Sequence, residues 1–185
     1  MAKYRFPSWK GYLLINPMRY LFQNPERILG DYVEPGMSVL DFGCSMGYFS
    51  IPVAKMVGEN GRVICVDVDQ KQLNVLRSRA RKRNLIDRLT IQCIEPSCAN
   101  FVLPESSVDL ALLLQVLHYM NAPVAALRRT HDSLKNGATM LVAEPKSHLT
   151  ESEWDDTLQM VADAGFAIGE QNTMYNLRMA VARKE

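Results

Sequence analysis

Short apolar runs alternate with amphipathic segments along most of this chain, from about residue 36 to residue 185. The runs are nearly unbroken, as in strands buried on both faces, whereas 70–83 places Leu73, Leu76 and Ala80 on one helical face. Such alternation favours a mainly parallel α/β sheet covered by helices. The predicted strands are 38–42, 62–66, 89–94, 108–114, 138–144, 166–170 and 177–183, and the predicted helices are 47–57, 70–83, 123–135 and 151–164. We expect Asn121 to cap the helix 123–135 and Asn136-Gly137 to end it, and a capping box of Thr150 and Glu153 to open the helix 151–164. Only a short link joins the last two strands, so we expect them to be antiparallel.

The first 35 residues have a different pattern. Asn16-Pro17 and Asn24-Pro25 each place a residue that suits an N-cap before one that suits the first helical position. Two short helices are therefore predicted, at 17–23 and 25–33. Because Pro35-Gly36 then breaks the chain, we expect an N-terminal helical segment over 1–35 and a main domain over 36–185.

Composition excludes several classes of protein. The formal net charge is only +1, so no strong overall field points to nucleic acid or to an acidic surface. The four cysteines form no CxxC pair and no zinc-type spacing, which predicts reduced thiols, no metal site and a cytoplasmic setting. The N-terminus lacks the pattern of a signal peptide, and no apolar run is long enough to span a membrane.

Two glycines four residues apart follow the first strand, in the stretch VLDFGCSMGYFS (39–50). Gly43 and Gly47 allow a sharp turn and a close approach to a ligand at the carboxyl end of a strand. A P-loop would need Lys-Ser/Thr after the second glycine, and a dinucleotide site would read G-x-G-x-x-G. Asp41 stands just before the glycines, where it would repel a pyrophosphate but attract a cation. S-adenosylmethionine carries a sulfonium and an ammonium group and has no phosphate.

A second acid, Asp67, ends the next apolar strand, VICVD (63–67). It lies 20 residues after Gly47, the position from which a carboxylate binds ribose hydroxyls. A ribose occurs in both NAD and S-adenosylmethionine, so Asp41 and the glycine spacing distinguish the two cofactors.

Four segments occur in the order found in class I S-adenosylmethionine-dependent methyltransferases: VLDFGCSMGYFS, GRVICVDVDQ, LPESSVDLALLLQVLHYM and LKNGATMLVAEP. The chain resembles that family over about residues 36–185. The resemblance implies a three-layer, Rossmann-like sandwich with a seven-stranded, mostly parallel sheet whose last strand is antiparallel. It also implies that the N-terminal segment, with Trp9, Lys10 and Tyr12, covers the cofactor cleft; the alternative is a tail packed elsewhere.

The resemblance also implies roles in cofactor binding. The glycine loop would wrap the methionine part, with Asp41 near the ammonium group, Asp67 on the ribose and Val68 on the adenine. Gln115 and Val116 would line the methionine side. The predicted cofactor residues are Asp41, Gly43, Cys44, Ser45, Gly47, Asp67, Val68, Cys98, Ala99, Gln115 and Val116.

Two departures from the family pattern stand out. Ser45 replaces a middle glycine, and we expect the loop to avoid strained torsions there, with its hydroxyl free to bond the cofactor. After the third strand, Cys98 falls nearest the position where the family often places an acid that reads the adenine amino group, so a backbone contact from Cys98 or Ala99 is predicted instead.

Candidate catalytic residues follow the fourth and fifth strands. His118 and Tyr119 come after the fourth strand, and His118 has the right chemistry for a general base; the alternative is that it only shapes the pocket. Glu144 and Lys146 come after the fifth strand, at the same edge of a parallel sheet, where they would meet the methyl acceptor or merely begin the next helix.

The predicted helix 70–83 ends in a run of basic residues. A solvated helix face explains this run better than RNA binding does, since no aromatic platform for stacking bases accompanies it. Its members are Arg77, Arg79, Arg81, Lys82 and Arg83. The predicted function is therefore S-adenosylmethionine-dependent methyl transfer, to a small molecule in preference to protein or RNA. The alternatives are a non-catalytic S-adenosylmethionine-binding module and, less favoured, a NAD-dependent oxidoreductase.

Overall fold

The computed structural model of the protein describes residues 18–185. Its strands follow the order β3-β2-β1-β4-β5-β7-β6. The described residues form two compact units, 18–94 and 95–185, and each is described by itself below. Trp9, Lys10, Tyr12 and the start of the first predicted helix lie outside the described residues.

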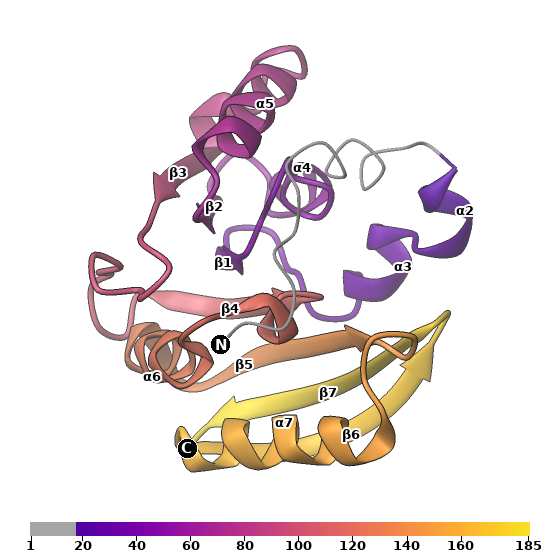
Figure 1. Cartoon of the computed structure of the whole chain (residues 1–185). Coiled ribbons are helices and arrows are strands. Elements are labelled where there is room, and N and C mark those ends of the chain that lie inside the picture. Colours follow the sequence, from indigo (N-terminus) through magenta and orange to yellow (C-terminus); the bar gives the residue numbers. More distant parts are fainter. Residues whose placement is uncertain (1–17) are drawn as a thin grey trace. The chain divides into compact units, whose positions relative to one another are not determined.

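In the first unit, β1 (Ser38–Phe42), β2 (Arg62–Asp67) and β3 (Leu89–Cys93) are parallel neighbours. Every residue of β1 is buried, including the polar Ser38 and Asp41. The helices α4 (Ser50–Met56) and α5 (Gln70–Arg81) connect these strands; α4 packs on β2 and α5 on β3 (Figure 1). The short helix η2 (Ile86–Arg88) leads into β3.

Two short helices precede β1. Asn24 caps α3 (Pro25–Leu29) by accepting a hydrogen bond from the Arg27 N–H, with Pro25 at the first position, as predicted. The other helix, α2 (Arg19–Phe22), is shorter than expected, with Gln23 as its C-cap, and α3 ends four residues earlier than 33.

In the second unit, β4 (Val108–Leu114) is parallel to β5 (Leu134–Pro145), and β7 (Leu177–Lys184) is antiparallel to both β5 and β6 (Phe166–Met174). Between them lie η3 (Leu117–Tyr119), α6 (Pro123–Ser133) and α7 (Glu151–Asp163). α7 runs along β6 (Figure 1) and begins at the predicted capping box of Thr150 and Glu153.

Two local predictions in this unit were wrong. Asn121 does not cap α6, because the N-cap position is Ala122. The helix also ends at Ser133 rather than at Asn136-Gly137, since Leu134 already pairs with Val108 of β4 and begins β5. The predicted fold class, a mostly parallel seven-stranded sheet with an antiparallel last strand, is confirmed.

Candidate functional site

The glycine loop leaves β1 and remains hydrogen-bonded to β2. The N–H groups of Gly43 and Cys44 both donate to the Val66 carbonyl oxygen, at 2.7 and 3.1 Å. Gly43 and Gly47 have φ of 78°, in the left-handed region that favours glycine. A Cβ on Gly47 would lie 2.3 Å from Cδ1 of Leu76, so α5 packs against this position closely enough to require glycine.

Ser45 differs from expectation. Its φ is 51°, so the loop does not avoid the strained region there. Its hydroxyl donates to Oε1 of Gln72 on α5, and its N–H donates to Oδ2 of Asp67 at 2.8 Å. These two bonds hold a torsion that a serine seldom adopts, and they engage the hydroxyl that we expected to find free for the cofactor.

Asp67 is fixed at the end of β2 by backbone donors. Its Oδ2 accepts from Ser45 and its Oδ1 accepts from the Asp69 N–H at 2.9 Å. Burial raises the pKa of Asp67, and the nearby Asp69 adds to the rise. A carboxylate has about four lone-pair sites, so each oxygen keeps capacity for a further donor such as a ribose hydroxyl. The next residue, Val68, is 52% exposed.

Asp41 is buried beneath the same loop. It is only 3% exposed, and the Ser50 hydroxyl donates to its Oδ2 at 2.5 Å. Burial raises its pKa to about 6, and the charge of Asp67 contributes. Ser50 was not predicted as a site residue, although it is the one polar side chain in the helix start SIPVA.

Cys44 is a buried free thiol. Burial raises its pKa well above the usual value, and the neighbouring thiol of Cys65 adds to this. Such a thiol is a poor nucleophile, which agrees with reading this cysteine as a small apolar residue of the loop.

In the second unit, the backbone polar groups of the predicted adenine contacts already have partners. The Cys98 N–H donates to Glu95 O and the Ala99 N–H to Ser97 Oγ, while Arg129 donates to the Ala99 carbonyl. Both carbonyl oxygens keep a second lone pair, so the adenine contact stays a prediction. Gln115 follows β4 with a φ of 60°, and its N–H donates to Ala143 O at 2.6 Å. Val116 leads into η3. The predicted roles of Gln115 and Val116 also stay predictions.

A buried acid organises the segment that follows β4. Glu144, near the end of β5, is fully buried, and its Oε1 accepts from the N–H groups of Leu117 (2.8 Å) and His118 (3.4 Å). Its Oε2 contacts Nδ1 of His118 directly. The structure thus brings together two residues that the sequence predicts only as separate candidates, 26 residues apart in the chain.

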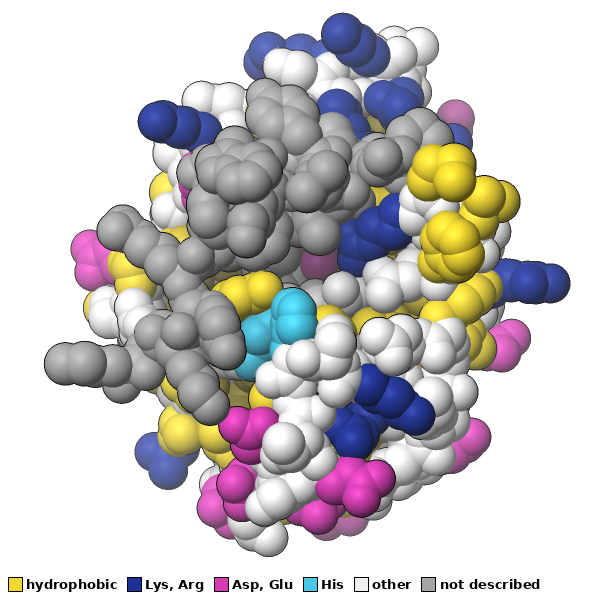
Figure 2. Space-filling view, turned by 45° about the vertical axis from the view of Figure 1, so that its right-hand side comes forward, with side chains coloured by type: hydrophobic (Ala, Val, Ile, Leu, Met, Phe, Trp, Pro, Cys, Tyr) yellow, Lys and Arg dark blue, Asp and Glu magenta, His cyan; other side chains and the backbone are white. Residues whose placement is uncertain are grey.

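A third residue, His148, extends this contact, although it is not among the candidate catalytic residues named from the sequence. Its Nδ1 lies 3.0 Å from Nε2 of His118, and the two rings meet edge to face at 4.9 Å. The Tyr119 ring lies against His118 at 3.9 Å. Figure 2 shows histidine side chains gathered at one place on the surface. Lys146 is exposed, and its backbone N–H donates to Asn176 O.

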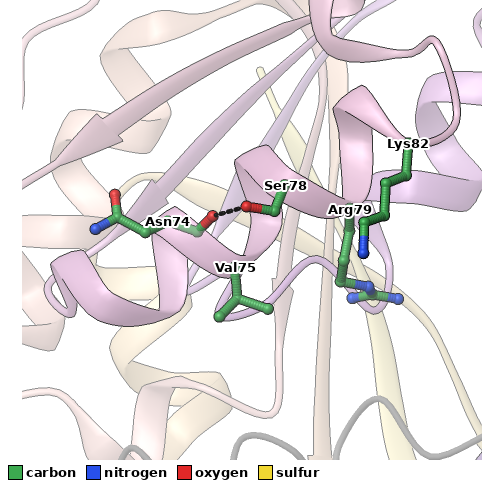
Figure 3. A pocket seen from close by; sticks show the side chains of 5 residues that line it. All are labelled: Asn74, Val75, Ser78, Arg79 and Lys82. Atoms are coloured by element: carbon green, nitrogen blue, oxygen red, sulfur yellow. Dashed lines mark hydrogen bonds between the residues drawn. The ribbon is translucent and has the colours of Figure 1, made fainter.

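None of the candidate site residues lines the shallow pocket on α5. It has a volume of about 310 Å³ and is lined by Asn74, Val75, Ser78, Arg79 and Lys82 (Figure 3). The Arg79 guanidinium donates to the Met46 carbonyl of the glycine loop, so this member of the basic run supports the loop. Within residues 18–185, no cluster of three or more His, Cys, Asp or Glu is arranged to hold a metal ion, and no helix could cross a membrane.

Comparison with known proteins agrees with this geometry. The model of a methyltransferase domain family matches residues 39–137, more than half of the chain. A ubiquinone/menaquinone biosynthesis C-methyltransferase of Shewanella sp. (strain ANA-3) is 27% identical over 125 residues, which are 66% of this chain and 49% of that protein. The chain therefore spans about half the length of such curated relatives.

Solved structures share the fold. An S-adenosylmethionine-dependent methyltransferase of Aquifex aeolicus is similar with a TM-score of 0.86 and 24% identity, covering 96% of this chain and 98% of that one. The [4+2]-cyclase SpnF is similar with a TM-score of 0.72 and 18% identity, covering 100% and 85%. Given the glycine loop, the two acids and the family match, this chain belongs to the class I S-adenosylmethionine-dependent methyltransferases, whose cofactor is S-adenosylmethionine.

Proposed function

We propose that the protein transfers the methyl group of S-adenosylmethionine to a small-molecule acceptor. The observation that carries this proposal is the loop after β1, whose Ser45 N–H is bonded to the Asp67 carboxylate and which begins two residues after the buried Asp41. The C-methyltransferase relatives support a small acceptor, because they are named for ubiquinone and menaquinone biosynthesis. The fold alone does not decide the chemistry, since it also occurs in a protein described as a cyclase.

Each element of the loop has a proposed task. Gly43, Cys44, Ser45 and Gly47 would follow the methionine part closely, and Asp41 would neutralise its ammonium group. Asp67 would accept the ribose hydroxyls, and the exposed face of Val68 would pack on the adenine. The sulfonium is already an activated leaving group, so the protein mainly aligns the methyl acceptor with the methyl carbon and excludes water.

Calorimetric titration tests the proposal. The protein is expected to bind S-adenosylmethionine and S-adenosylhomocysteine in the micromolar range typical of enzyme ligands, and not NAD. Binding of NAD alone would overturn it. Binding without methyl transfer to any acceptor would favour the non-catalytic module instead.

Replacing Asp67 by Ala is expected to weaken S-adenosylmethionine binding by about 1–3 kcal/mol, because charged hydrogen bonds to the ribose are lost. Calorimetry measures this, with a thermal melt to confirm folding. Glu59→Ala is the matched control, since it removes the same charge from an exposed position of the same unit. Equal affinity of a folded Asp67→Ala variant and the control would contradict the ribose assignment.

Affinity for the cofactor is expected to fall below pH 6. The pKa of Asp41 is about 6 in the free protein, so this acid is mostly neutral at pH 5 and mostly ionised at pH 7. A bound cation favours the ionised form, so binding near pH 6 should release a proton, and affinity should fall by up to about tenfold per pH unit below it. Titrations in buffers of different ionisation enthalpy count that proton. Asp41→Asn should abolish the release; a proton count unchanged in this variant would assign the effect to another group.

A further inference from the structure

We propose that Glu144, His118 and His148 form a proton relay that ends at Nε2 of His148, and that the methyl acceptor carries an ionisable hydroxyl or an acidic C–H proton. This inference rests on the proposed methyl transfer and narrows its substrate class.

The hydrogen-bond partners assign the protons along the relay. Oε1 of Glu144 accepts from two backbone N–H groups, and a carboxylate can only accept. Its Oε2 therefore receives the proton on Nδ1 of His118, which leaves Nε2 of a neutral His118 as an acceptor. Nδ1 of His148, 3.0 Å away, must then donate. The free lone pair of the relay is consequently on Nε2 of His148.

Exposure decides which imidazole meets the methyl acceptor. The His118 side chain is only 5% exposed and that of Glu144 is 0% exposed, whereas His148 is exposed. A substrate proton thus reaches His148, and His118 acts through it as a positioning residue. Among the described residues, the ionisable groups facing His148 are His118, Glu144 and Tyr119. Burial lowers the pKa of His148, and His118 adds to this, which keeps the ring neutral and able to accept a proton.

The step is balanced. As the acceptor atom bonds to the methyl carbon, the C–S bond breaks and its electron pair returns to sulfur, giving S-adenosylhomocysteine. The acceptor's proton goes to Nε2 of His148 while the proton on Nδ1 passes to Nε2 of His118. The positive charge ends on the buried imidazole paired with Glu144, where a charge-assisted hydrogen bond stabilises it. The proton later returns through His148 to water.

Histidine tautomers test the relay without any substrate. The full chain contains only three histidines, so long-range ¹H–¹⁵N spectra can assign each ring, with His131 on α6 as the internal reference. We expect Nδ1–H tautomers for His118 and His148. Glu144→Gln keeps the shape of the side chain but donates to Nδ1 of His118, so it should reverse both tautomers and leave His131 unchanged. An Nε2–H tautomer of His118 in the wild type, or a His148 unaffected by the substitution, would overturn the relay.

Activity tests the substrate class. Labelled S-adenosylmethionine is offered with phenols, quinols and β-dicarbonyl compounds, and in parallel with thiols and tertiary amines. His148→Ala should lower kcat on the first group by about 10²-fold or more at pH 7, with a smaller deficit at high pH and partial rescue by imidazole. His131→Gln is the control, and cofactor affinity should stay within about twofold in both variants. A deficit equal at every pH, or methylation of thiols or tertiary amines alone, would overturn the inference. A wild type that binds no S-adenosylmethionine would instead refute the proposed function, and the tautomer result would still stand.

Discussion

Replacing Gly47 by Ala should destabilise the protein by about 2–4 kcal/mol and weaken S-adenosylmethionine binding at least about tenfold, because strain and a clash act at the same residue. The φ of 78° costs a residue with a Cβ about 1–2 kcal/mol. The new Cβ would also lie 2.3 Å from Cδ1 of Leu76, a side chain with no exposed surface. The Leu76 side chain, α5 or the loop must move, and the loop carries the proposed cofactor contacts. Urea unfolding and calorimetry measure the two effects.

Gly58→Ala separates strain from clash. Gly58 has a similar φ of 71°, but no heavy atom lies within 4 Å of its added Cβ. The Gly58→Ala variant should lose only the stability that backbone strain costs, and it should keep its cofactor affinity. The difference in unfolding free energy between the two variants therefore gives the cost of the clash, at about 1–3 kcal/mol. Equal stability losses in both variants would mean that Leu76 accommodates a methyl group and that the loop is not packed as described.

Glu144→Ala should lower the free energy of unfolding by about 3 kcal/mol or more, because it leaves buried donors without an acceptor. The N–H groups of Leu117 and His118 and the His118 ring all depend on this carboxylate. Glu144→Gln keeps an oxygen for the backbone donors and should lose much less. Urea unfolding gives both values, and an unchanged m-value confirms that compactness is retained.

Asp109→Ala is the matched control for this experiment. The Asp109→Ala substitution also removes a salt bridge, which joins Asp109 to Lys135 at 2.5 Å, but both of these side chains are partly exposed. Such pairs contribute about 0–1 kcal/mol. If Glu144→Ala cost no more than Asp109→Ala, the buried carboxylate could not be what holds η3 beside β5.

The strands and the glycine loop were predictable from the sequence because they depend on local chemistry. β1 and β4 are mostly apolar, interrupted only by Ser38 and Asp41 in β1 and by Asp109 in β4, and their bounds match the predicted 38–42 and 108–114. The end of α6 was not predictable in this way. Asn136-Gly137 is a strong turn signal, and Gly137 does adopt a φ of 74°, but pairing of β5 with β4 has already begun at Leu134. Strand pairing, which is tertiary, overrode the local signal.

For the candidate site too, the sequence predicted what depends on local pattern and not what depends on tertiary contacts. Asp41 and Asp67 were identified because each ends or interrupts an apolar strand, a pattern visible in one stretch of sequence. The rule that loops meet at the carboxyl ends of parallel strands also placed His118 and Glu144 on one edge. That rule gives no side-chain rotamers, so it could not show that Glu144 turns inward to His118 or that His148 completes the row. Ser45 was misjudged because its left-handed torsion depends on Gln72 and Asp67, both distant in sequence.

The last hairpin has a consequence for how the protein resists aggregation. β6 is the last strand in the sheet order and pairs with β7 on one side only. The unpaired side of an edge strand is a template to which a strand of another chain can add. The register of β6 shifts between Ile168 and Gln171, and the exposed Glu170 lies within that irregularity. A bulge and a charge at this position make the edge twist away and repel an incoming strand. These two features oppose the addition of another strand at this edge, which is the first step of fibre growth.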